Sequence, residues 1–184
     1  MKVANYYCLA LLPFLFFSCG ASENKTGLPE KDKTVDFVSM QLKLKKETEN
    51  SPTGYDHPET ICFQLKYRFT NEKGAPQDVL YKDIFTDDAF QKRVHALSFE
   101  LTRHFFIETK GVRIPCRIAH FEQNYFVNGE RTSLVYFNTK DLKEILSTQE
   151  PFTLIYEDEE FGLGVSEFYF NKEDVTQINL YYHV

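Results

Sequence analysis

The chain contains 184 residues with 27 acidic and 21 basic side chains, which gives a formal net charge of −6 at pH 7. This acidic balance disfavours nucleic-acid binding, which depends on a basic stripe or patch, so we expect no nucleic-acid partner. Aromatic residues make up 16% of the chain, with 18 Phe, 11 Tyr and no Trp. Such rings are typical of half-buried sheet surfaces, so the composition favours β structure.

The N-terminus has the build of a signal peptide. Lys2 provides a positive start, and residues 6–17 form an uncharged run that ends at Ser18 and Cys19. A helix of about 12 residues spans about 18 Å, whereas the hydrocarbon core of a bilayer is about 30 Å thick. Because the run is too short for a permanent transmembrane helix, we expect residues 1–18 to be a cleaved signal peptide.

The end of this segment reads Leu15-Phe16-Phe17-Ser18-Cys19. These residues resemble the lipobox of bacterial lipoproteins, in which a small residue precedes a lipidated cysteine. The resemblance implies cleavage between Ser18 and Cys19, then attachment of a diacylglycerol and an N-acyl chain such as palmitate to Cys19. Two or more acyl chains give stable anchoring, so the membrane becomes a partner through Cys19. The alternative is an ordinary signal peptide and an unmodified cysteine.

The region after the cysteine predicts a tether and one domain in the cell envelope. The residue after Cys19 is Gly20, and a glycine at this position resembles the sorting signal of lipoproteins sent to the outer membrane. Display of the domain in the periplasm and display at the cell surface both stay open. Residues 19–34 are polar, with Gly and Pro, so we expect a lipidated N-terminus followed by a flexible tether. The remaining residues, 35–184, have the length of a single domain.

A two-residue alternation of apolar and polar side chains dominates this domain and predicts short strands. The clearest runs are residues 38–44 and 61–70, and Asn128-Gly129 predicts a hairpin between 125–127 and 134–137. The other expected strands are 79–85, 99–107, 112–118, 152–156, 165–170 and 177–184.

Two segments predict short helices. Thr86 or Asp87 can cap a helix over residues 86–97, although strand structure is an alternative there. Asn138 is followed three residues later by Asp141, and residues 142, 145 and 146 form an apolar stripe.

Many short strands without βαβ spacing predict an all-β, mainly antiparallel fold. Our first expectation is an immunoglobulin-like Greek-key β-sandwich of eight or nine strands with one or two short helices. An open β-barrel is the alternative.

Cys62 and Cys116 remain after the leader and Cys19 are set aside. An oxidising compartment makes them a candidate disulfide. The alternation argues against it, because Cys62 falls on the polar side of its strand and Cys116 on an apolar side. Both alternatives stay open.

Binding residues are indicated by adjacent aromatic pairs, because neighbours in a strand point to opposite faces of the sheet. Either both faces are covered, or one face carries an apolar patch that binds a partner. The candidate patch consists of Phe106, Phe126 and Tyr181. We find no catalytic motif and expect no catalytic residue, metal or cofactor.

Three functions compete at this point. The first is a membrane-anchored envelope lipoprotein that acts as a non-enzymatic binding or structural module, with another envelope protein as its partner. The second is a periplasmic inhibitor or immunity lipoprotein whose acidic surface mimics a charged substrate. The third is a hydrolase with an unrecognised site, which predicts a cleft with convergent titratable groups.

Overall fold

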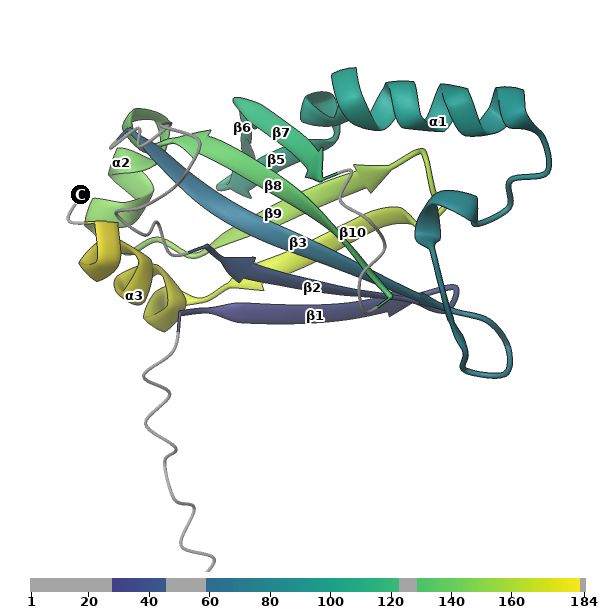
Figure 1. The fold of residues 1–184 in the computed structure, drawn as a ribbon. Helices are drawn as coiled ribbons and strands as arrows, with labels where there is room; N and C mark the ends of the chain where they lie inside the picture. Colours follow the sequence, from purple (N-terminus) through teal and green to yellow (C-terminus); the bar gives the residue numbers. More distant parts are fainter. Residues whose placement is uncertain (1–27, 46–58, 123–128, 183–184) are drawn as a thin grey trace, which may run out of the picture.

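The computed structural model describes residues 28–45, 59–122 and 129–182, and these form ten β-strands and three α-helices (Figure 1). The strands are β1 (Glu30–Val35), β2 (Val38–Leu44), β3 (Thr60–Thr70), β4 (Pro76–Gln77), β5 (Phe105–Thr109), β6 (Val112–Pro115), β7 (Ile118–Glu122), β8 (Glu130–Asn138), β9 (Phe152–Asp158) and β10 (Gly164–Phe170). The helices are α1 (Asp87–Phe99), α2 (Thr139–Thr148) and α3 (Lys172–Tyr182), with 3-10 helices η1 (Val79–Tyr81) and η2 (Leu101–His104).

The strands form two antiparallel sheets. The first has the order β1-β2-β3-β8-β7, with the short β4 on β3, and the second has the order β10-β9-β5-β6. Phe63 of β3 meets Phe170 and Phe152 of the second sheet edge to face, with ring centroids 5.5 and 6.5 Å apart. Aromatic rings therefore fill the space between the sheets, and the expected all-β sandwich is confirmed, with sheets that do not close into a barrel.

The strand order differs from the expected immunoglobulin-like Greek key. In an immunoglobulin domain the first, second, fourth and fifth strands share one sheet and the chain crosses between sheets after the second. Here β1, β2 and β3 are consecutive neighbours in one sheet, and local hairpins build most of the rest. The crossing from the second sheet to the first occurs at Cys116, whose N–H donates to Phe105, while the next residue, Arg117, donates to Tyr136.

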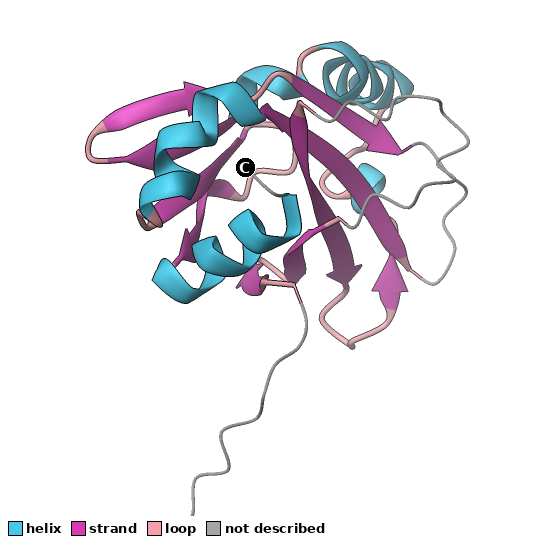
Figure 2. Cartoon of the chain, turned by 90° about the vertical axis from the view of Figure 1, so that its left-hand side faces the viewer, coloured by secondary structure: helices cyan, strands magenta, loops and turns pink. Residues whose placement is uncertain are grey.

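The two ends of the sandwich differ. We call the end at which β1 begins the proximal end; α2 and α3 cover it, as the end-on view shows (Figure 2). We call the opposite end the distal end. It carries the β1–β2 turn at Asp36–Phe37, the turn at residues 71–74, η1 and the start of α1 (Figure 1).

The first correction concerns the tether, which was expected to extend to Thr34. The structure begins a strand at Glu30 and pairs it along its whole length with β2. Four of its six residues are charged, so the sequence gives no alternating apolar signal there. Lys31 anchors it instead, because its Nζ lies 2.5 Å from the Asp174 carboxylate and 5.4 Å from the centre of the Phe170 ring.

A second correction concerns residues 79–85, which were expected to form a strand. They contain η1 instead, because the Asp78 side chain accepts a hydrogen bond from the Leu80 N–H and caps a helical turn. Asp83 then adopts a positive φ of 57°, which strand geometry does not allow.

A third correction concerns residues 177–184, also expected to form a strand. Through Tyr182 they belong to α3, and the last two residues lie outside the described part. The side chains of Asn171 and Asp174 each accept a hydrogen bond from the backbone N–H of the other, which is a reciprocal helix cap. Val175 and Ile178, three residues apart, are both fully buried.

The two expected helices are present. Thr86 caps α1 by accepting a hydrogen bond from the Ala89 N–H, and Asn138 caps α2 by accepting one from Lys140. The expected 99–107 strand is shortened to β5 because η2 occupies its first half. Residues 112–118 divide into β6 and the start of β7.

Side chains cover the edges of the two sheets. The Lys33 ammonium of edge strand β1 donates to the Val165 carbonyl of edge strand β10 at 3.4 Å. On β7, the Ala119 N–H donates to the Thr102 hydroxyl of η2 at 3.1 Å. The edge strand β6 ends at Pro115, which has no N–H to offer a new strand.

Candidate functional site

The structure does not bring the sequence-predicted binding residues together. Cys19 and Phe126 lie outside the described residues. Phe106 projects from the outer side of β5, where the Arg113 guanidinium lies 4.6 Å from its ring centre. Tyr181 belongs to α3 rather than a strand, and it packs against the buried core beside Tyr182. Phe106 and Tyr181 therefore belong to different surfaces.

Cys62 and Cys116 are buried and lie on either side of β8. Cys62 on β3 pairs with Tyr136 of β8, whereas the Cys116 sulfur approaches β8 from the β7 side, 3.4 Å from the Tyr136 carbonyl oxygen and 3.1 Å from that of Ile118. Burial raises the pKa of the Cys116 thiol to about 12, so this thiol stays protonated at neutral pH. The disulfide between them stays a prediction.

Among the described residues, three of the five exposed aromatic side chains lie at the distal end, and the other two are Phe99 and Tyr169. Phe85, in the segment between η1 and α1, is 92% exposed, and Tyr81 and Phe37 are 60% and 57% exposed. The Tyr81 ring stacks on Phe90 of α1, with centroids 5.0 Å apart and planes at 12°. We call these four residues the distal aromatic surface, in which Phe90 is half-buried and Phe37 lies apart on the β1–β2 turn. Rings on the outside of a folded domain are candidates for contact with a partner.

The backbone under this surface is held by a buried arginine. The Arg93 guanidinium of α1 donates to the carbonyl oxygens of Leu80 and Lys82 at 3.0 and 2.5 Å, and its centre lies 5.4 Å from the Phe161 ring. Burial lowers the pKa of Arg93, yet a guanidinium stays charged in proteins. One side chain thus joins α1, η1 and the β9–β10 hairpin.

An ion pair fixes the other side of η1. Arg131 of β8 donates to both carboxylate oxygens of Asp78, and each side chain is only 10% exposed. Asp78 is also the residue that caps η1. The exposed Tyr81 and Phe85 therefore follow a segment that is tied to the sheet by a bidentate, largely buried contact.

Carboxylates border the distal aromatic surface. Asp83 is paired with the ammonium of Lys82, at 2.7 Å, and this hydrogen bond lowers the pKa of Asp83. The Lys82 side chain is 10% exposed and that of Asp83 is 73% exposed. Asp87 and Asp88 occupy the first turn of α1, where Asp88 pairs with the exposed Lys92. More carboxylate groups than ammonium groups are therefore exposed to solvent near these rings.

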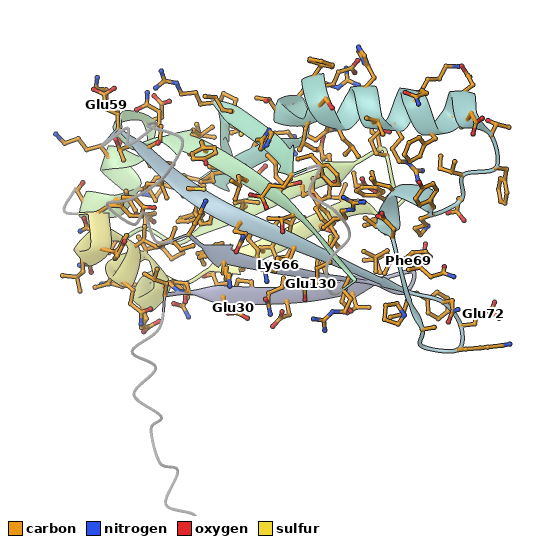
Figure 3. The ribbon with its side chains drawn as sticks, viewed as in Figure 1. Glu30, Glu59, Lys66, Phe69, Glu72 and Glu130 are labelled. Atoms are coloured by element: carbon orange, nitrogen blue, oxygen red, sulfur yellow. The ribbon has the colours of Figure 1, made fainter. Side chains whose placement is uncertain are left out.

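A polar groove crosses the outer face of the first sheet and forms a second candidate. Its volume is about 270 Å³, and Lys66 and Glu130 lie on this face (Figure 3). The Glu130 carboxylate accepts from Lys66 at 3.1 Å and from Arg68, and these hydrogen bonds lower its pKa. Because the charges pair with one another, the groove presents no strong preference for a ligand.

A cluster of buried hydroxyl and carboxylate groups lies between the sheets. The Tyr156 hydroxyl donates to Asp158 at 2.7 Å, and the same carboxylate accepts the N–H groups of Glu160, Phe161 and Leu163. Burial raises the pKa of Tyr156 far above its ordinary value. These contacts shape the β9–β10 hairpin, and we assign them a structural role.

Among the described residues, no three His, Cys, Asp or Glu side chains are grouped so that they could hold a metal ion. In the same residues no helix has both the length and the apolar character needed to cross a bilayer.

Comparisons with known proteins add little to this geometry. No protein-family model matches the chain, and no curated protein matches it. One solved structure is similar, a protein of unknown function from Burkholderia pseudomallei K96243, with 8% sequence identity, a TM-score of 0.45, and coverage of 82% of this chain and 83% of that one.

Sequence reasoning missed the distal aromatic surface. Tyr81 and Phe85 belong to residues 79–85, for which we expected a short strand. The Thr86-Asp87-Asp88 run was a usable signal, because a helix that starts at residue 87 leaves Phe85 in a connection rather than in a sheet.

Proposed function

We propose that this chain is a membrane-anchored envelope lipoprotein whose β-sandwich domain is a non-enzymatic module that binds another protein. Leu15–Cys19, by their resemblance to a lipobox, support export and lipid attachment at Cys19. The observation that carries the binding role is Phe85, which is 92% exposed beside a stacked pair of rings. A second candidate function has no separate observation in its favour.

Exposing a phenylalanine to water forgoes about 1.5–3 kcal/mol that its burial would contribute. The Phe85 side chain lies beside elements that Arg93 and Asp78 hold in place. The Tyr81 ring, which is stacked on Phe90, loses little conformational entropy when a partner covers it, which favours binding.

The test of anchoring is metabolic labelling of cells that express the full chain or its Cys19→Ser variant, using a clickable palmitate analogue. We expect label on the unsubstituted protein and a membrane location for it after fractionation. The Cys19→Ser variant should lose the label. A Cys8→Ser variant is the matched control, because this cysteine lies in the expected signal peptide and should leave labelling unchanged.

Equal absence of label from the unsubstituted protein and from Cys19→Ser, with both in the soluble fraction, would overturn the proposal. Label retained in Cys19→Ser would also contradict the assignment of Cys19 as the attachment site.

A further inference from the structure

We infer that the connection between η1 and α1 has two arrangements, in which the rings of Tyr81 and Phe85 alternate on the same side of the Phe90 ring. The structure holds the arrangement in which Tyr81 is stacked on Phe90 and Phe85 is 92% exposed. The exchange is a property of this segment and is independent of lipid attachment. Its effect on a partner, which meets a different ring in each arrangement, rests on the proposed function.

The start of α1 predicts an aromatic contact that this arrangement does not make. Thr86 is the N-cap of α1, because its side chain accepts a hydrogen bond from the Ala89 N–H. An apolar residue directly before an N-cap often packs against the fourth residue of the helix. Phe85 and Phe90 occupy these two positions, yet the Phe85 ring is almost fully exposed. The sequence therefore offers Phe90 a second ring partner.

Tyr81 occupies the place that this contact would take. Its ring and the Phe90 ring have centroids 5.0 Å apart and planes at 12°. Phe90 also packs against the buried core, so Tyr81 covers the outward side of the Phe90 ring. Phe85 reaches that side only when Tyr81 leaves it, and the two contacts exclude each other.

The backbone between the two rings is strained. Asp83 has a positive φ of 57°, a left-handed conformation that is unfavourable for a residue with a Cβ. Bringing Phe85 over Phe90 requires new backbone angles in residues 83–85, which can release this strain. A hydrogen bond from the Ile84 N–H to the Tyr81 carbonyl, at 3.2 Å, opposes the change. Strain and hydrogen bonding therefore act in opposite directions, which brings the two arrangements close in free energy.

The residues on both sides of this segment are held in place, so the change is local. Arg93 of α1 donates to the carbonyl oxygen of Lys82, directly before the segment. The Thr86 cap holds the first turn of α1 directly after it. The exchange thus moves residues 83–85 and the Tyr81 side chain only.

Fluorine NMR of the full chain tests the exchange, with para-fluorophenylalanine incorporated at position 85 and the protein purified in detergent. We expect relaxation dispersion of this signal, caused by exchange with a minor population of about 0.1–10%. The matched control carries the same label at Phe99, which is 77% exposed at the other end of α1. Its signal should show no dispersion.

Substitution of the competing rings separates the two arrangements. Tyr81→Ala vacates the side of Phe90 and should move the signal of residue 85 to the position of a packed ring. Phe90→Ala removes the shared ring and should leave only the exposed position. Tyr169→Ala also removes an exposed tyrosine and should change neither the position nor the dispersion of the signal. Melting temperatures above that of the NMR measurement show that the variants are folded.

Two variants of Asp83 measure the contribution of the strain. Asp83→Gly and Asp83→Ala both remove the carboxylate that pairs with Lys82, but only glycine adopts positive φ without cost. Glycine should therefore favour the arrangement seen in the structure. The fraction of molecules with residue 85 packed on Phe90 should be about fivefold lower in Asp83→Gly than in Asp83→Ala.

Absence of dispersion at residue 85 in the otherwise unsubstituted protein would overturn the inference. Identical signal positions in Tyr81→Ala and Phe90→Ala would also overturn it, because residue 85 would then have no contact with Phe90 to gain. Equal packed fractions in the two Asp83 variants would contradict the role of the strain. None of these measurements depends on Cys19, so their failure is distinct from failure of the palmitate experiment.

Discussion

The two ends of the sandwich are stabilised in different ways. At the proximal end, α2 buries Leu142, Ile145 and Leu146, so the helix is part of the hydrophobic core. At the distal end, α1 is three residues longer but its buried residues are Arg93 and Leu97. Apolar packing stabilises α2, whereas hydrogen bonds from the buried Arg93 cation position α1. A helix fixed by polar contacts can therefore leave its aromatic neighbours exposed.

The largest expected effect is at the proximal end. Leu146→Ala removes a fully buried side chain and should lower the free energy of unfolding by about 2–5 kcal/mol, through lost burial and the cavity left behind. Urea denaturation measures it. Phe85→Ala is the control and should change stability by less than about 0.5 kcal/mol. Similar losses in the two variants would show that the ends do not differ in packing.

Arg93→Met should have the next largest effect, because it keeps an apolar stem and removes the donors to Leu80 and Lys82. Leaving carbonyl oxygens without charged donors should cost about 2 kcal/mol. Hydrogen exchange should accelerate at the amides of Tyr81 and Lys82, which lie in η1 and directly after it. Lys92→Met, on the exposed side of α1, is the control. Unchanged exchange in Arg93→Met would contradict the positioning role of Arg93.

A stabilising change is expected in the β1–β2 turn. Asp36 and Phe37 both adopt positive φ, 44° and 63°, which costs residues other than Gly about 1–2 kcal/mol each. Asn-Gly is the preferred pair for such a turn. Asp36→Asn with Phe37→Gly should therefore raise the free energy of unfolding by about 0.5–1 kcal/mol after the entropy cost of Gly. Lower stability in thermal or urea denaturation would indicate that the Phe37 ring contributes packing there.

The smallest effect is a pH dependence at Glu160, near Arg93. Burial raises the pKa of Glu160 above its ordinary value of 4.5, so folding favours its protonated form. This contribution is fully present below the ordinary pKa and is lost as the pH rises through the raised value. Glu160→Gln should melt at a higher temperature than the unsubstituted protein at pH 7, and at the same temperature below pH 4. A difference that persists in acid would contradict this account.

The sequence predicted the elements whose signals are local. Alternation located β2, β3, β9 and β10, and the capping residues Thr86 and Asn138 located the helices they precede. Each of these signals comes from side chains that contact their own segment or a single sheet face, so it is present without knowledge of the tertiary structure.

The elements that sequence reasoning missed depend on distant contacts. β1 is charged, and it is held by Lys31, which reaches Asp174 in a helix 143 residues later. The C-terminal segment alternates well enough for a strand, but the Asn171–Asp174 cap starts a helix before it. The order of strands, and with it the location of Phe85 at one end, follows from pairings that no local pattern encodes.

The contacts at the sheet edges bear on the proposed attachment to a membrane. Lipid attachment confines molecules to two dimensions, where copies collide often and in similar orientations. Unpaired strands under such crowding would add to one another and form aggregates. The Lys33–Val165 contact, the Thr102 hydroxyl on Ala119 and Pro115 at the end of β6 each oppose that addition. These contacts would keep neighbouring copies separate at the surface density that the proposed lipid attachment creates.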